Sequence, residues 1–171
     1  MGRLSKINLD LRNLNIHFVI FIFKSQRFIT FQLSTGKDLA MKKSGILNPQ
    51  LQRAIAELGH TDLICIADAG LPIPDSVERI DLSLVLGTPA IDQVIDAIAA
   101  ECVFQKKIFA SEAEAKNYAF VEKLEDAWPD IETEKIAHED FKVLLAKCRF
   151  VIRTGESRPY ANLILESGVP F

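Results

Sequence analysis

Two polar phrases of this sequence combine residue types that could move protons and bind hydroxyl groups. The first is Gly59-His60-Thr61-Asp62, and the second, Asp68-Ala69-Gly70-Leu71-Pro72-Ile73-Pro74, follows after a short apolar run. Imidazole has an ordinary pKa of about 6.5, which allows proton transfer near neutrality. Glycine and proline stiffen a loop, so a carboxylate within it is held in place. The pattern indicates a rigid site that presents His60 and Asp68 to a small polyhydroxy ligand.

A third phrase near the C-terminus, Thr154-Gly155-Glu156-Ser157-Arg158-Pro159-Tyr160-Ala161-Asn162, offers further polar groups. Residues 161–165 are predicted to form a strand, and a turn at residues 155–156 is predicted to lead into it. Side chains two apart on a strand share one face, so Tyr160 and Asn162 are expected to converge on one ligand. His138, at an expected helix start, is another candidate. Each residue also fits a plain structural role in a turn, strand or helix terminus, and the pattern leaves both explanations open.

A metal site is the alternative interpretation of the first two phrases. His60, Asp62 and Asp68 supply an imidazole and two carboxylates, which suit several divalent ions. No closely spaced ligand pair of the His-x-x-x-His kind accompanies them. The three cysteines are an odd number in no metal-ligand spacing, and each lies in an apolar stretch, which predicts reduced core thiols. We therefore expect neither a metal ion nor a cofactor.

Composition and charge are those of one ordinary globular domain. The chain has 171 residues, of which 49% are hydrophobic and 25% are charged. Six basic and two acidic side chains give residues 1–40 a net charge of +4. Because the whole chain has a net charge of −3, residues 41–171 carry −7. An acidic body lacks the basic stripe that binds phosphate backbones, which argues against nucleic acid as a partner.

The first 40 residues are expected to form a separate N-terminal extension, with residues 41–171 as the functional domain. The apolar run at residues 17–23 is much shorter than the roughly 20 residues of a membrane span, and no signal cleavage site follows it. We therefore expect no membrane partner. The change in character at Met41 leads to the hypothesis that Met41 is the native start. Residues upstream of Met41 in an N-terminal mass analysis of the native protein would contradict it.

Alternating helical and strand patterns predict an α/β fold, a single layered domain with a central β-sheet flanked by helices. Lys106, Lys107 and Lys123 are expected on solvated faces, and Trp128 in the core or at an interface. A capping box is predicted at residues 111–114. Strands are expected at residues 63–67, 79–84, 103–110, 132–137, 150–152 and 161–165. Helices are expected at residues 48–59, with Asn48 as the N-cap, from 88 to about 102, from 111 to about 128, and from about 138 to 148.

Taken together, the three phrases resemble the D-ribose pyranase family of cytoplasmic sugar mutarotases, over residues 41–171. The phrases Glu78-Arg79-Ile80-Asp81 and Ala137-His138-Glu139-Asp140-Phe141 match in the same order, whereas residues 107–135 match poorly. The related fucose mutarotases carry Gly-His-Gly-Asp and Asp-Ala-His-Phe-Pro, so Thr61, Gly70 and Leu71 favour the ribose branch. The resemblance implies that His60 is the catalytic proton donor and that the sugar is bound by Asp68, His138, Tyr160 and Asn162.

The activity implied by the resemblance is interconversion of the pyranose and furanose forms of D-ribose, without metal or cofactor. It also implies a cytoplasmic homo-oligomer, a decamer of two pentameric rings, with sites between neighbouring subunits. Three other functions remain open at this point. They are a mutarotase for another sugar such as L-fucose, a ribose-binding accessory protein without catalysis, and a metal-dependent hydrolase that uses His60, Asp62 and Asp68.

Overall fold

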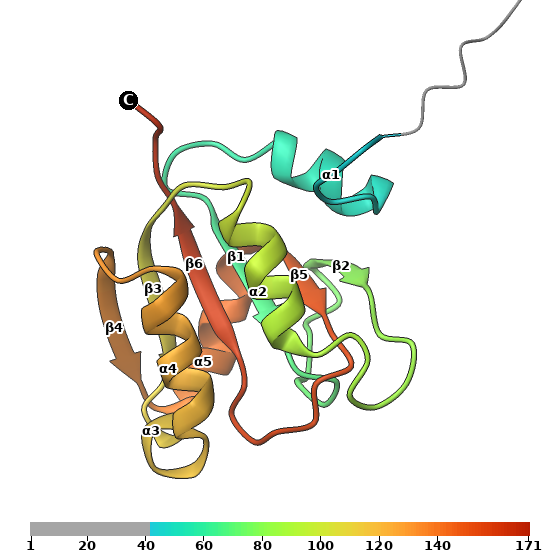
Figure 1. Cartoon of the computed structure of the whole chain (residues 1–171). Helices are drawn as coiled ribbons and strands as arrows, with labels where there is room; N and C mark the ends of the chain where they lie inside the picture. The colour runs from blue at the N-terminus through green and yellow to red at the C-terminus, as the bar shows by residue number, and fades with distance from the viewer. Residues whose placement is uncertain (1–41) are drawn as a thin grey trace, which may run out of the picture. The chain divides into compact units, whose positions relative to one another are not determined.

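The computed structural model describes residues 42–171, and the expected N-terminal extension lies outside them (Figure 1). It confirms the predicted α/β domain with a central sheet flanked by helices. A short 3-10 turn, η1 (Leu145–Lys147), joins the last helix to the fifth strand. The other elements are α1 (Pro49–Ala56), β1 (Leu63–Ala67), β2 (Glu78–Asp81), α2 (Ile91–Ala99), β3 (Phe104–Ala110), α3 (Glu112–Lys116), α4 (Tyr118–Ala127), β4 (Glu132–Ile136), α5 (His138–Leu144), β5 (Cys148–Arg153) and β6 (Leu163–Ser167).

The strands form one mixed sheet in the order β2-β5-β1-β6-β3-β4. β6 is antiparallel to both of its neighbours, β1 and β3, and every other adjacent pair is parallel. All strands except β6 therefore point in one direction. We call the side where they finish the carboxyl end of the sheet, and the opposite side the amino end. Ligands of α/β proteins commonly bind where parallel strands finish, so the carboxyl end is a natural place for a site.

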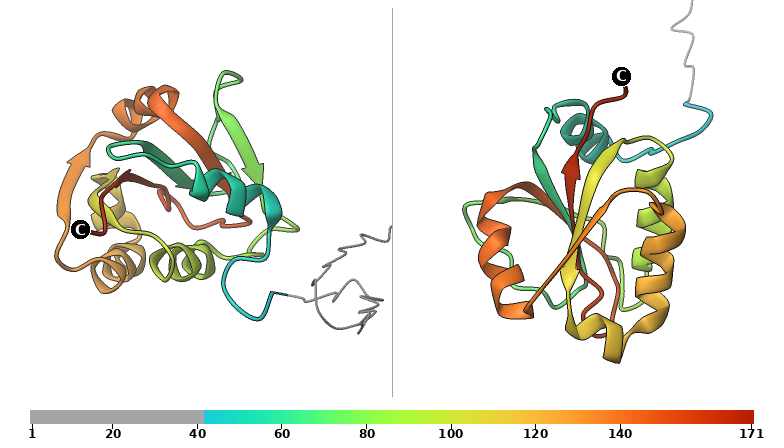
Figure 2. Two further views of the ribbon diagram at one scale, coloured as in Figure 1. Left: turned by 90° about the horizontal axis from the view of Figure 1, so that it is seen from above. Right: turned by 90° about the vertical axis from the view of Figure 1, so that its left-hand side faces the viewer.

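The central strand β1 is buried on both faces, as its unbroken apolar run predicts. Ile64 and Ile66 belong to a core cluster with residues of α2 and α4, and Cys65 and Ala67 belong to a second cluster with residues of α5 and η1. All four side chains are fully buried. Figure 2 shows the corresponding layers, with α5 on one side of the sheet and α2 and α4 on the other.

The three cysteines carry free thiols, and two of them are buried as predicted. Cys65 and Cys148 lie inside the sheet, whereas Cys102 follows the end of α2 and is only half-buried. Burial raises the pKa of Cys102 to about 11 and that of Cys148 to about 12. Burial, with smaller contributions from the neighbouring Cys148 and Asp68, raises the pKa of Cys65 well above its ordinary value.

Of the predicted helix N-termini, that of α1 is confirmed and that at Ser111 is wrong. Asn48 caps α1 as predicted, because its side-chain oxygen accepts the Leu51 N–H at 2.9 Å. The capping box predicted at Ser111 is wrong, since the Ser111 side chain makes no capping bond. The single helix predicted from residue 111 to about 128 is also broken, at Asn117, into α3 and α4. The Asn117 amide donates to the Pro159 carbonyl at 3.0 Å, a contact that competes with a continuous helix.

Lys107 is fully buried, so its predicted place on a solvated face is wrong. Its Nζ lies 2.6 Å from the Trp128 carbonyl oxygen and 3.0 Å from Glu125 Oε2. These acceptors sit at the C-terminal end of α4, where backbone carbonyls lack helical partners and the helix dipole favours a cation. The Lys107 ammonium therefore caps the C-terminal end of α4 from strand β3. Trp128 is buried against Phe104, as predicted for a core aromatic residue.

Gly155 lies where the loop after β5 meets the loop of residues 82–90. A methyl group added to Gly155 would fall well inside van der Waals distance of the backbone oxygens of Val85 and Thr88. Since these are backbone atoms that cannot rotate away, we expect Gly155→Ala to lower the free energy of unfolding by about 3 kcal/mol. Gly59→Ala is the matched control, because its methyl group would meet only the Asp62 carboxylate, at 3.6 Å. Equal urea midpoints for the two variants would contradict this expectation.

Candidate active site

Asp68 and Asn162 are linked at the carboxyl end of the sheet. Asp68 directly follows β1, and Asn162 directly precedes β6. Asn162 Nδ2 donates to Asp68 Oδ2 at 2.7 Å, and the Asp68 backbone N–H donates to Asn162 Oδ1 at 2.8 Å. The Gly70 N–H donates to the other carboxylate oxygen at 2.8 Å. The Asp68 carboxylate is therefore fixed in orientation, and each of its oxygens keeps a lone pair for a ligand hydroxyl.

His138 and Tyr160 lie together at the same end of the sheet. Their rings meet edge to face with centroids 5.1 Å apart. The His138 backbone N–H donates to both carboxylate oxygens of Glu112, at 3.1 and 3.2 Å, which fixes the start of α5. His138 Nδ1 is buried and has no hydrogen-bond partner among the described residues. Buried polar atoms are nearly always hydrogen-bonded, so an unpaired nitrogen at this place is unusual and marks His138 as a candidate for a ligand contact.

A turn, rather than a strand, carries Tyr160 and Asn162, so the prediction that they alternate on one strand face is wrong. β6 begins only at Leu163, and the Asn162 N–H donates back to the Tyr160 carbonyl at 2.9 Å. Tyr160 has a φ of +56°, and Thr61, with +67°, is the other non-glycine residue among residues 42–171 with a positive φ. Strained backbone of this kind is concentrated at functional sites. Tyr160 is itself a predicted site residue, and Thr61 directly follows another, His60.

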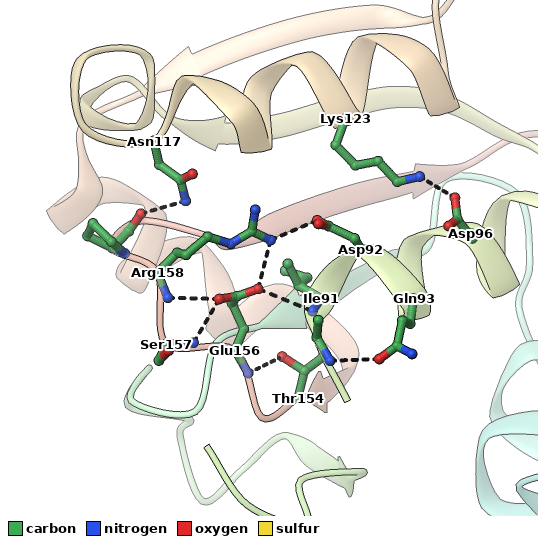
Figure 3. A network of polar contacts seen from close by, with 12 residues as sticks. Ile91, Asp92, Gln93, Asp96, Asn117, Lys123, Thr154, Glu156, Ser157 and Arg158 are labelled. Carbon is green, nitrogen blue, oxygen red and sulfur yellow. Dashed lines mark hydrogen bonds and ion pairs between the residues drawn. The ribbon is translucent and has the colours of Figure 1, made fainter. Parts of the chain in front are cut away.

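A buried carboxylate, Glu156, holds the loop that leads to Tyr160 (Figure 3). Its Oε1 accepts the N–H groups of Ser157 and Arg158, both at 2.8 Å. Its Oε2 accepts from the Arg158 guanidinium at 2.8 Å and from the Ile91 N–H, at the start of α2, at 3.3 Å. The guanidinium also donates to Asp92 at 2.8 Å. The sequence pattern indicates only a turn at residues 155–156 and misses this role, which joins the loop to a helix N-terminus.

The contacts of Glu156 favour its charged form. Burial alone would raise the pKa of Glu156, but hydrogen bonds from the Arg158 side chain and from the Arg158 and Ser157 N–H groups lower it to about 2. The same carboxylate raises the pKa of Arg158 above its ordinary value. The pair is therefore ionised throughout the physiological pH range.

His60 lies at the amino end of the sheet, in the turn before β1. Its exposed imidazole has Nε2 3.0 Å from Gln105 Oε1. The turn is joined to the end of β6, because the Thr61 N–H donates to the Ser167 carbonyl and the Ser167 N–H donates to the Asp62 carbonyl, both at 2.9 Å. The end of β6 therefore sets the position of His60, and the same strand begins beside Asn162 at the carboxyl end of the sheet.

Strand β1 separates His60 from Asp68 within one chain. Its five residues rise about 3.3 Å each, so the two side chains are anchored at least about 15 Å apart. The structure therefore brings together Asp68, His138, Tyr160 and Asn162, which we call the carboxyl-end cluster, and leaves His60 apart from it. For the same reason, the alternative metal site of His60, Asp62 and Asp68 cannot form within a single chain.

A hollow between α1, β2 and β5 is distinct from both groups of residues. Its volume is about 210 Å³, and it contains none of the predicted site residues. The side chains that line it are Ala54, Glu57, Leu58, Glu78, Cys148, Arg149 and Phe150. The chemistry-bearing residues are therefore found on the open ends of the sheet rather than in this hollow.

The lowered pKa of Glu156 predicts how stability depends on acid. Because its folded pKa of about 2 lies below the unfolded value of about 4.5, its contribution is present above pH 4.5 and is lost as the pH falls towards 2. The difference corresponds to about 3 kcal/mol. We expect Glu156→Gln to lower stability at pH 7 by an amount of this order and to flatten the decline between pH 4.5 and 2, as measured by urea unfolding. Glu122→Gln, on the exposed surface of α4, is the control, and parallel acid profiles for the two variants would contradict the prediction.

Comparison with known proteins places these observations in a family. Residues 41–170 match the RbsD / FucU transport protein family. A Bacillus subtilis protein named D-ribose pyranase is 50% identical over 131 residues, which cover 77% of this chain and 100% of that protein.

Solved structures agree with this match. The structure of Bacillus subtilis RbsD complexed with D-ribose has a TM-score of 0.74 at 50% identity, and the similarity covers 77% of this chain and 100% of the other. The fucose mutarotase of Streptococcus pneumoniae, solved in complex with L-fucose, has a TM-score of 0.61 at 25% identity, with 72% and 94% covered. The family match spans all of the described residues except the last, and the chain therefore belongs to the RbsD / FucU transport protein family.

Proposed function

We propose that this chain is a D-ribose pyranase, an enzyme that interconverts the pyranose and furanose forms of D-ribose. The observation that carries the proposal is the carboxyl-end cluster, in which a fixed carboxylate lies at the same sheet end as a histidine with an unpaired buried nitrogen. The 50% identity to the Bacillus subtilis D-ribose pyranase, over that protein's full length, supports the same activity. Fixed oxygen and nitrogen acceptors beside an aromatic ring suit a small sugar.

The chemistry requires only proton transfer. As the anomeric hydroxyl loses its proton, the bond between C1 and the ring oxygen breaks, the carbonyl forms at C1, and the ring oxygen takes up a proton. The open-chain aldehyde then recloses through a different hydroxyl. We assign His60 as the group that takes and returns the proton, a role that typically contributes about 10²–10⁴-fold. Asp68, His138 and Tyr160 hold the hydroxyls, and Asn162, whose amide is bonded to Asp68, orients that carboxylate.

The separation of His60 from the carboxyl-end cluster supports a site shared between two copies of the chain. In this arrangement His60 of one copy meets the cluster of the next. A contact that joins two different surfaces is head-to-tail, and repeated contacts of this kind close into a ring where the rotation between copies divides a full turn. This geometry agrees with the pair of pentameric rings, a decamer, that the family resemblance implies.

An exposed apolar loop at the carboxyl end of the sheet supports such an assembly. Leu84, Val85 and Leu86 follow β2 and are 79%, 62% and 76% exposed. Their loop packs against Gly155, on the same side as the carboxyl-end cluster. Three consecutive exposed apolar side chains are unusual on a monomeric surface and are expected at an interface.

L-Fucose is the less favoured substrate. The fucose mutarotase structure shares 25% of its residues with this chain, half the identity of the ribose-bound relative. Thr61, Gly70 and Leu71 also follow the ribose branch of the family. A ribose-binding protein without catalysis remains the second candidate function, and the measurement of exchange described below distinguishes it from the enzyme.

The proposed setting is the cytoplasm, with residues 1–40 as an extension to the domain of residues 41–171. The family match begins at residue 41, which supports this division. Among the helices of residues 42–171, none has the length and apolar character needed to cross a membrane.

Saturation-transfer NMR of D-ribose tests the activity directly. We expect the purified protein to accelerate exchange between pyranose and furanose forms, and His60→Ala to reduce that acceleration by about 10²-fold or more. L-Fucose exchange, measured in parallel, provides the substrate control. Exchange at the background rate from folded, assembled protein that still binds ribose would favour the accessory-protein function instead.

A shared site predicts complementation between two inactive variants. His60→Ala lacks the acid–base group and Asp68→Asn alters the carboxyl-end cluster, so neither is expected to be active alone. When the two chains are co-expressed in equal amounts, about a quarter of the head-to-tail sites receive both intact halves. We expect about a quarter of the wild-type exchange activity per site. Inactivity of mixed assemblies whose composition is confirmed by mass spectrometry would contradict a site shared between two copies.

A further inference from the structure

Gln105 stands at an irregularity in β3 that directs its side chain towards His60. The pairing of β3 with β6 shifts between Phe104 and Lys106, which leaves Gln105 as an extra residue in the ladder. Such a β-bulge commonly re-aims a side chain beside an active site. Here Gln105 Oε1 lies 3.0 Å from His60 Nε2. The bulge therefore supplies a contact to an imidazole that is otherwise exposed.

Glu166, on β6, fixes the orientation of the side-chain amide of Gln105. Gln105 Nε2 donates a hydrogen bond to Glu166 Oε1. An ionised carboxylate only accepts, so Gln105 must turn its NH₂ group to Glu166 and its oxygen to His60. An amide oxygen also only accepts, so His60 Nε2 must carry the hydrogen. The neutral imidazole is therefore the Nε2–H tautomer, and Nδ1 is the nitrogen that can take up a proton.

Strand β6 provides both the side chain that orients Gln105 and the backbone carbonyl that positions the turn at His60. Glu166 and Ser167 are neighbours on β6, and Ser167 accepts the Thr61 N–H beside His60 at 2.9 Å. The positive φ of Thr61 sets the direction in which the turn leaves His60. The imidazole is thus positioned through its backbone by Ser167 and through its ring by Gln105.

We propose that Gln105, held by Glu166, is the positioning residue that fixes the orientation and tautomer of His60 for proton transfer to the sugar. This inference rests on the proposed function of His60 as the acid–base group. It assigns the working nitrogen as Nδ1 and gives Gln105 no direct contact with the substrate.

Replacing Gln105 by leucine removes the acceptor and leaves an apolar side chain that is one atom shorter. We expect Gln105→Leu to lower kcat about tenfold and to change KM less than about twofold, because the ring is misplaced while the carboxyl-end cluster is intact. The matched control is Gln52→Leu on α1, where Gln52 likewise donates to a glutamate, Glu101, at 3.3 Å. The control is expected to keep the wild-type kcat.

A reciprocal exchange, Gln105→Glu with Glu166→Gln, tests the contact without relying on activity. The double variant keeps the net charge and both hydrogen bonds, but a carboxylate now accepts from His60 directly. We expect the pKa of His60, followed by NMR of its ring Cε1–H without sugar, to rise by about one unit, and the pH–rate profile to move with it. The other charged groups of this turn, Asp62 and its neighbour Arg149 at 3.6 Å, are unchanged.

The outcomes separate the inference from the proposed function. An active wild-type protein whose kcat is unaffected by Gln105→Leu would overturn the positioning role. An unchanged His60 pKa in the double variant would overturn the contact itself, even if Gln105→Leu failed to fold. Background exchange by the wild type, with the His60 pKa raised in the double variant, would instead overturn the proposed function and leave the contact established.

Discussion

Burial of β1 on both faces is the constraint on which the rest of the structure depends. A shift of one residue would exchange the side chains packed under α2 and α4 for those packed under α5, so the register of the strand is fixed. Its ends then fix the places of His60 and Asp68. β6 lies beside β1 in the opposite direction and carries Asn162 at one end and Glu166 at the other. Two neighbouring strands therefore position both halves of the proposed site.

The two halves are held by different kinds of interaction. At the carboxyl end, the buried Glu156 pairs with the half-buried Arg158 through charge-assisted hydrogen bonds, a rigid support that suits the sugar-binding role proposed for the nearby cluster. At the amino end, His60 is exposed and its ring is contacted by the neutral amide of Gln105. A neutral amide orients the imidazole without placing a charge beside it, which suits the acid–base role proposed for His60.

Local patterns predicted what depends on nearby residues. The apolar run of β1, the Asn48 cap and the α/β order follow from neighbours in the sequence, and the polar phrases identified the four residues that the structure gathers at the carboxyl end. Pairing between distant segments decided the rest. Lys107 is buried because a helix C-terminus some twenty residues later covers it. Gln105 is aimed by a bulge whose register is set by β6, and no local signal marks either.

The thiol of Cys65 adds a property of another kind. Thiolate is the form that reacts with alkylating reagents, and burial within β1 leaves almost none of it at neutral pH. The sulfur lies on the face of the sheet that α5 and η1 cover, so a reagent can reach it only while this layer opens. The rate at which native Cys65 is alkylated therefore reports how often this face of the sheet is exposed, and the natural sequence already contains this probe of breathing motions.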